Sequence, residues 1–107
     1  MNRDEVQAEF DAVVNMTATE LEQWLDTADS KRVGQHQNDG ESVGHKSGRQ
    51  IVALLRAKRS ELSAQDEQHM RKVVGYVHRH LGQRPSGDVR DTRWRYSLMN
   101  WGHDPCK

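Results

Sequence analysis

The stretch SAQDEQHMRKVVGYVHRHLG, residues 63–82, decides the fold. Ser63 followed by Asp66 is a helix-start signal, and Gly82 is a helix-stop signal. Between these signals the apolar side chains recur at helical spacing, at Met70, Val73, Val74, Val77 and Leu81. A helix with one apolar side must bury that side against other elements. Because alternation at period two is not convincing anywhere in the chain, the sequence predicts an all-α fold.

Four further helices are expected on either side of this one. They are Arg3–Val14, a helix capped by Thr17 or Thr19 and running to about Ala28, a helix from Ser47 or Gly48 to about Lys58, and a helix capped by Asp91 or Thr92 and ending before Gly102. The segment between Asp29 and Gly48 has no apolar periodicity and is predicted to be a long irregular loop. Gln83 to Arg90 is expected to be a shorter loop around Pro85 and Gly87.

The apolar content is low for a single domain over residues 1–107. Leu, Ile, Val and Phe together make up 19 of the 107 residues, near the level at which chains become disordered when net charge is also high. Trp24, Trp94 and Trp101 lie on helical stripes and would each bury a large area. We therefore expect them in the core, with base stacking as the alternative.

The net charge of zero is an average over two unlike parts. Residues 1–30 carry one basic and eight acidic side chains, a net charge of −7, and residues 31–107 carry fifteen basic and eight acidic ones, a net charge of +7. One interpretation is an acidic helical flank beside a basic surface that attracts polyanions. The other is that the two parts pair with each other.

Three basic clusters are candidates for contacts with nucleic-acid phosphates, and one of them is Arg93 and Arg95 beside Trp94 and Tyr96 on the fifth helix. The Gly40–Gly48 loop opens the third helix, where glycines permit close approach, but its spacing does not fit a P-loop. Gly75 lies between basic residues of the fourth helix, where it favours close approach of either a phosphate backbone or a neighbouring helix. The third and fourth helices could form a helix-turn-helix variant, but Asp66 and Glu67 would then lie in the first turn of the recognition helix and repel DNA. Backbone contact is therefore favoured over base readout. The candidate contacts are Lys46, Arg49, Arg71, Lys72, Arg79, Arg93 and Arg95.

The sequence offers no pattern typical of catalysis, of a metal site or of a cofactor site. His78 and His80 are two residues apart, so they point to different sides of a helix and do not form a ligand pair. The start MNRDE is charged, and the longest apolar run is Ile51 to Leu55. We therefore expect a cytoplasmic protein that is not an enzyme, with a single reduced cysteine, Cys106.

Long blocks of the sequence resemble one known family. The blocks are MT at 16–17, ELE at 20–22, WL at 24–25, SK at 30–31, GESVGHKSGR at 40–49, HMRKVVGYVHRHL at 69–81, RP at 84–85, GD at 87–88 and DTRWRYSLMNWGHDP at 91–105. The chain closely resembles domain-of-unknown-function family 3140, whose short microbial and fungal members are sometimes labelled possible DNA-binding proteins. The resemblance implies no catalytic or ligand residues.

The sequence is compatible with two functions. The first is binding of DNA or RNA backbone through a basic face. The alternative is a protein-interaction or stress-associated module, self-associating or with another protein, in which the acidic helices cover that face.

Overall fold

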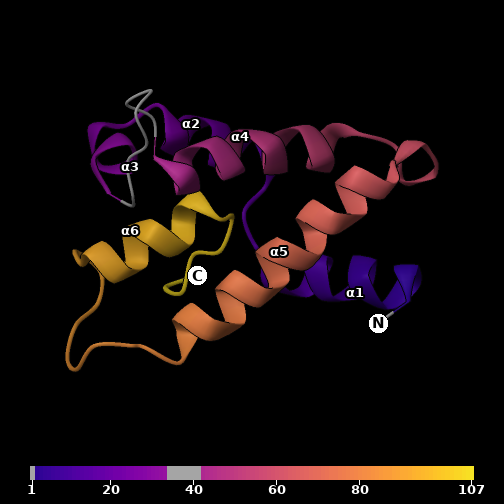
Figure 1. Ribbon diagram of the computed structural model, residues 1–107. Coiled ribbons are helices and arrows are strands. Elements are labelled where there is room, and N and C mark those ends of the chain that lie inside the picture. Colours follow the sequence, from indigo (N-terminus) through magenta and orange to yellow (C-terminus); the bar gives the residue numbers. More distant parts are fainter. Residues whose placement is uncertain (1, 34–41) are drawn as a thin grey trace.

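The computed structural model describes residues 2–33 and 42–107, and helix α5 (Ala64–Leu81) crosses the molecule diagonally (Figure 1). Helix α1 (Arg3–Val13) packs against α5, and α2 (Ala18–Leu25) packs against α4 (Val43–Arg56). Helix α6 (Arg93–Asn100) contacts all of α2, α4, α5 and the short α3 (Ala28–Arg32), and a 3-10 turn, η1 (Arg59–Glu61), precedes α5. The all-α prediction is confirmed, and the described residues contain no strand.

The predicted capping residues explain where several helices begin. Thr17 and Glu20 form the capping box of α2, so Thr17 rather than Thr19 is the cap. Ser63 and Asp66 form the capping box of α5, as predicted. The Thr92 hydroxyl accepts a hydrogen bond from the backbone N–H of Arg95 and caps α6.

The predicted irregular segment from Asp29 to Gly48 is wrong at both ends. The second helix ends at Leu25, and Thr27 caps a separate helix, α3, which was not predicted. Ser42 caps α4, so this helix begins at Val43, before the predicted start at Ser47 or Gly48. Residues 34–41, which include Gly40, lie outside the described residues.

The glycines of α4 are needed for close packing and not for an unusual backbone conformation. Gly44 and Gly48 are helical, and neither has a positive φ. A Cβ atom on Gly48 would lie 2.6 Å from the carbonyl oxygen of Asn100 and 2.6 Å from Leu25 Cδ2. Helix α4 therefore approaches the end of α6 more closely than a side chain would allow.

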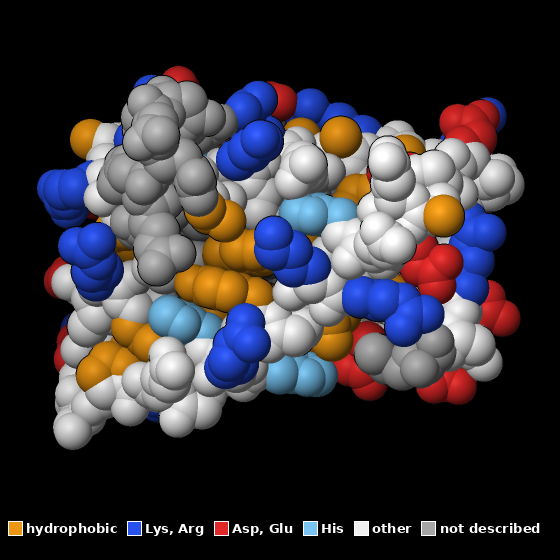
Figure 2. Space-filling model, viewed as in Figure 1, with side chains coloured by type: hydrophobic (Ala, Val, Ile, Leu, Met, Phe, Trp, Pro, Cys, Tyr) orange, Lys and Arg blue, Asp and Glu red, His pale blue; other side chains and the backbone are white. Residues whose placement is uncertain are grey.

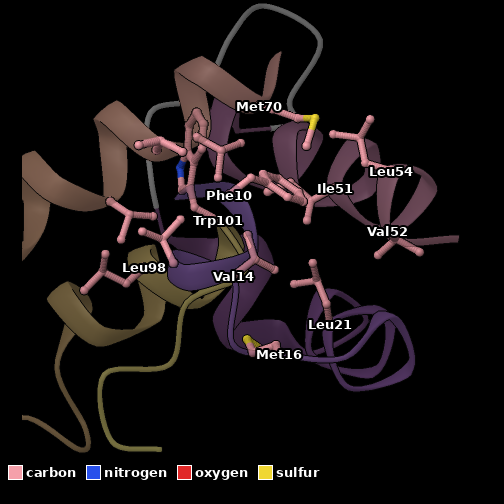
Figure 3. Close-up of a cluster of buried hydrophobic side chains, with 14 of the residues drawn as sticks. Phe10, Val14, Met16, Leu21, Ile51, Val52, Leu54, Met70, Leu98 and Trp101 are labelled. Atoms are coloured by element: carbon pink, nitrogen blue, oxygen red, sulfur yellow. The ribbon is translucent and has the colours of Figure 1, made fainter. Parts of the chain in front are cut away.

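A single core is formed by side chains from the five longer helices (Figure 3). Phe10, Leu21, Ile51, Met70 and Leu98 are its largest fully buried apolar side chains. Two of the three tryptophans belong to it, with Trp101 only 3% exposed and Trp94 8% exposed, while Trp24 packs at its margin. The expected core positions of Trp94 and Trp101 are confirmed. No helix among the described residues has the length and apolarity needed to cross a membrane.

The buried Asn100 joins α2, α3 and α6 by hydrogen bonds. Its Oδ1 accepts from Trp24 Nε1 at 2.7 Å and from Ser30 Oγ at 2.6 Å, and its Nδ2 donates to the Ser30 carbonyl at 3.1 Å. Asn100 is 1% exposed and Ser30 is fully buried, so these bonds satisfy polar groups that water cannot reach. The network fixes the end of α6, from which Trp101 extends.

Candidate nucleic-acid interface

Five aromatic rings form a row between α5 and α6, which we call the ring row. Its order is His69, Trp101, Tyr76, His80 and Trp94. Successive ring centroids are 6.4, 4.1, 5.1 and 6.4 Å apart, and neighbouring planes are within 17° of parallel. Each inner ring therefore has both of its faces directed at neighbouring rings.

Helical spacing explains which rings can take part. His69, Tyr76 and His80 are separated by seven and four residues, so they lie on one side of α5. Trp94 and Trp101 are also seven residues apart, one in α6 and one at its C-cap. The Trp94 indole is held in place because its Nε1 donates to the His80 carbonyl at 2.7 Å. The packing of α6 against α5 then interleaves the two sets.

A groove of about 440 Å³ runs beside the middle of the ring row. Figure 2 shows hydrophobic and histidine side chains side by side on this face, with lysines and arginines around them. Gly44 of α4 forms part of the wall, where a Cβ would lie 3.1 Å from Trp101 Nε1. The full lining is Val43, Gly44, Tyr76, His80, Arg93, Ser97, Asn100 and Trp101.

Burial and nearby cations favour neutral histidines in the ring row. Burial lowers the pKa of His80, and the charge of Arg79 lowers it further. His80 Nε2 is buried and has no hydrogen-bond partner among the described residues. Burial also lowers the pKa of His69, with Lys72 acting in the same direction, although the hydrogen bond with Ser47 and the charge of Asp66 oppose the shift. An anion bound nearby would favour protonation of both rings.

Four of the seven candidate contacts lie around this groove. Arg93 lines it, and Lys72 and Arg79 lie four residues before and three residues after Tyr76 on α5. Lys46 lies between Val43, which lines the groove, and Gln50, which lines a hollow with His69, so it is on the same side of α4. We call Lys46, Lys72, Arg79 and Arg93 the groove cations.

The groove cations differ from most other basic residues in lacking a carboxylate partner. All four are exposed, and none forms an ion pair within residues 2–33 and 42–107. Other exposed cations do pair, including Arg56 with Glu22 at 2.8 Å and Lys107 with Glu20 at 2.6 Å. The positive potential around the groove is therefore not cancelled by direct partners in the described part of the chain.

The other three candidates lie elsewhere. Arg49 lines a second hollow on the α2 side of α4, together with Glu22 and Asp26. Arg71 pairs with Glu67 at 3.2 Å, one turn earlier on α5. Arg71 directly precedes Lys72 in the sequence but lies on a different side of α5, because successive helix positions turn by about 100°.

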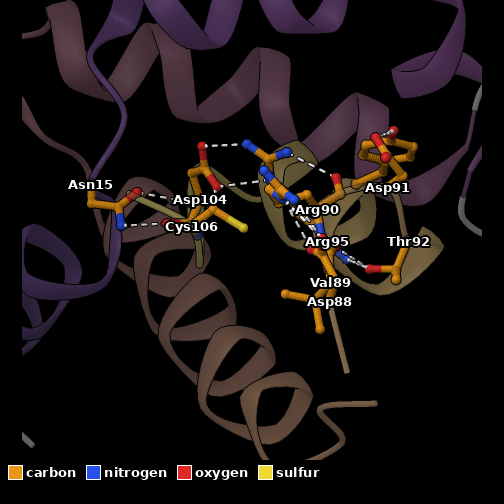
Figure 4. Close-up of polar contacts among 10 residues, drawn as sticks. Asn15, Asp88, Val89, Arg90, Asp91, Thr92, Arg95, Asp104 and Cys106 are labelled. Carbon is orange, nitrogen blue, oxygen red and sulfur yellow. Dashed lines mark hydrogen bonds and ion pairs between the residues drawn. The ribbon is translucent and has the colours of Figure 1, made fainter. Parts of the chain in front are cut away.

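Arg95 has a structural role at the C-terminal end of the chain (Figure 4). Its guanidinium donates to both carboxylate oxygens of Asp104, each at 3.1 Å, and to the Arg90 carbonyl at 2.9 Å. Burial opposes ionisation of Asp104, but the bonds from Arg95 and from the Cys106 N–H outweigh it and lower its pKa. Asn15 is bonded to the Asp104 backbone through both its Oδ1 and its Nδ2, so this cluster joins the C-terminal residues to the α1–α2 link.

One basic residue at this face was not among the predicted contacts. The Arg84 Cζ lies 5.5 Å from the centroid of the Trp94 ring, in cation–π geometry at the end of the ring row. Arg84 is in the loop after α5, so helical spacing gives no signal for it. The sequence predicts a loop around Pro85 and Gly87 here and gives Arg84 no particular position in it.

Six of the eight acidic residues of the N-terminal flank pair with residues other than the groove cations. Helix α1 buries Val6 and Phe10 and packs against α5, and its Asp11 pairs with Arg59. Glu9 lies 3.7 Å from His78, which places His78 beside α1, away from the ring row. Among the described residues, then, the acidic helices do not cover the groove cations.

Gly75 is open to solvent on α5. A Cβ at this position would meet no atom of the described residues within 4 Å, so none of the helices described here approaches it. In the described ranges, no cluster of three His, Cys, Asp or Glu side chains is suited to a metal ion.

The fold and groove define a small all-α protein with a cation-lined aromatic groove. The model of the family described as "Protein of unknown function (DUF3140)" matches residues 9–99, and the chain belongs to this family. The resemblance inferred from the sequence is thereby confirmed. Neither the curated proteins nor the solved structures contain a match to the chain.

Proposed function

We propose that this protein is a non-catalytic, cytoplasmic nucleic-acid-binding protein whose groove cations contact the phosphate backbone of DNA or RNA. The observation that carries the proposal is the gathering of Lys46, Lys72, Arg79 and Arg93 on one face without carboxylate partners among the described residues. Unpaired cations release the counterions of a polyanion when they contact phosphates, and this release drives backbone binding.

Salt dependence gives the proposal a quantitative test. Four phosphate contacts on a duplex predict a slope of about −3.6 for the logarithm of the binding constant against the logarithm of salt concentration, at about −0.9 per contact. Fluorescence anisotropy with labelled duplex DNA and duplex RNA over a range of salt concentrations would measure this slope.

A matched pair of double variants tests where the contacts lie. Lys72→Gln with Arg79→Gln removes two groove cations, and we expect the slope to become less steep by about 1.8. Lys31→Gln with Arg56→Gln removes one lysine and one arginine elsewhere, with the same change in net charge. This control should leave the slope unchanged.

Three outcomes would contradict the proposal. They are absence of binding at low salt, binding that does not depend on salt, and equal losses in the two double variants. Binding of polyglutamate in place of DNA and RNA would favour the alternative, a protein-interaction module.

A further inference from the structure

We infer that the groove beside the ring row takes the base of an unpaired nucleotide, so that the preferred ligand is single-stranded nucleic acid. The inference rests on the proposed function and specifies its ligand. The evidence for base insertion is the edges of the aromatic rings, whereas the evidence for the proposed function is the groove cations.

The ring row presents edges to the groove because the faces of the inner rings are directed at one another. Trp101 and Tyr76 are stacked 4.1 Å apart, and Tyr76 and His80 are stacked 5.1 Å apart, and all three line the groove. An aromatic ring is electropositive at its edge and electronegative on its face. A planar base lying across the row would therefore meet it in the favourable edge-to-face arrangement.

The polar groups around the groove suit a nucleotide. Trp101 Nε1 lies beside Gly44, where a Cβ would come within 3.1 Å of it, and Ser97 offers a hydroxyl group. Arg93 is exposed at the wall and can contact a phosphate next to the inserted base. The volume of about 440 Å³ lies within the range typical of small-ligand sites.

Base insertion distinguishes a single strand from a duplex. In a duplex the bases are paired and stacked inside, so a surface groove meets only the backbone. Bases of a single strand can turn outward onto aromatic side chains while the backbone follows a basic surface. A groove between Lys46, Lys72, Arg79 and Arg93 offers both kinds of contact.

The test compares two single strands that carry equal numbers of phosphates, with the duplex as a reference for backbone binding. A short oligothymidylate, an abasic strand of the same length and the matching duplex would be titrated in fluorescence anisotropy at one salt concentration. We expect the intact protein to bind oligothymidylate more tightly than the abasic strand by roughly 2- to 12-fold, the range expected of one edge-to-face aromatic contact.

Two substitutions that leave the net charge unchanged test whether the base binds in this groove. Tyr76→Leu removes a ring but keeps apolar bulk, and Ser97→Leu fills part of the groove while leaving the ring row intact. Each should reduce the preference for oligothymidylate over the abasic strand and leave affinity for the abasic strand and the duplex unchanged. Urea unfolding identifies a variant that fails to fold, in which case the other variant supplies the result.

The outcomes separate this inference from the proposed function. Equal affinity of the intact protein for oligothymidylate and the abasic strand would overturn base insertion, while salt-dependent binding would still support backbone contact. Equal weakening of strand and duplex by both folded variants would also overturn base insertion. Failure of every polyanion to bind would overturn both.

Discussion

Replacing Gly48 by alanine should destabilise the protein, although alanine is the better helix former. Gly48 lies in the interior of α4, where replacing glycine by alanine normally stabilises a helix by about 0.5–1 kcal/mol. Here the added Cβ would lie 2.6 Å from the backbone oxygen of Asn100 and 2.6 Å from Leu25 Cδ2. The methyl group therefore meets two different helices.

The packing cost should exceed the gain in helix propensity. Overpacking a core typically costs about 1–3 kcal/mol, and the upper part of that range applies because one of the two atoms is a backbone carbonyl. Moving that carbonyl would also disturb the hydrogen bonds of Asn100 to Trp24 and Ser30. The net expectation for Gly48→Ala is a loss of about 1–2 kcal/mol in the free energy of unfolding.

Gly75→Ala is the matched control for this prediction. Gly75 is also inside a long helix, α5, but its Cβ would meet no atom within 4 Å. Only the propensity effect remains, so this variant should be more stable than the natural sequence by about 0.5–1 kcal/mol. The opposite signs at two helical glycines isolate the contribution of tertiary packing.

Urea unfolding followed by circular dichroism at 222 nm would measure both variants. Thermal unfolding offers a second measure, since each kcal/mol shifts the midpoint of a domain near this size by about 4–8 °C. If Gly48→Ala proved as stable as Gly75→Ala, the close approach of α4 to Asn100 would not be the reason for a glycine at position 48.

Three further substitutions test other parts of the structure. Asn100→Ala should lower the free energy of unfolding by about 2–4 kcal/mol, because buried groups of Ser30 lose their partner. Asp104→Asn should lower it by about 1–3 kcal/mol by removing the charge that pairs with the partly buried Arg95. Stability of the natural protein should fall as pH drops below about 6.5, because His80 has a lowered pKa when folded and takes up a proton more readily when unfolded. His80→Phe keeps the ring and should make this decline shallower.

Each of these expectations has a result that would contradict it. Equilibrium urea unfolding that shows Asn100→Ala to be as stable as the natural protein would mean that its hydrogen bonds are replaceable. For Asp104→Asn, unchanged stability would remove the structural role assigned to Arg95. For His80→Phe, unfolding free energies measured at pH 7.5 and 5.5 should converge, and a decline as steep as that of the natural protein would place the proton uptake elsewhere.

Local sequence signals predicted the longer helices because those signals act within one helix. The capping pair Ser63 and Asp66 and the apolar spacing from Met70 onward depend only on the neighbouring turns, and α5 begins as they indicated. The start of α4 was missed because Gly44 and Gly48 favour a loop when they are considered locally. Their small size is required by the contact with α6, which no local signal contains.

The candidate interface was predicted in part for the same reason. Spacing alone places Lys72 and Arg79 on either side of Tyr76. Spacing did not distinguish the groove cations from Arg71, which pairs with Glu67, or from Arg95, which pairs with Asp104 nine residues later. Ion pairing depends on which side chains meet after folding, so it distinguishes cations that look alike in the sequence.

By itself the sequence determined that the chain is helical and which side of each long helix is apolar, because a helix repeats every 3.6 residues wherever it lies. Only the tertiary structure decided that Trp101 stands between His69 and Tyr76 of α5, that Trp94 follows His80 in the same row, and that Arg93 lines the groove beside the row. The order His69, Trp101, Tyr76, His80, Trp94 joins residues up to 32 positions apart. Such an order depends on the position and angle at which two helices pack, and the periodicity of either helix leaves both undetermined.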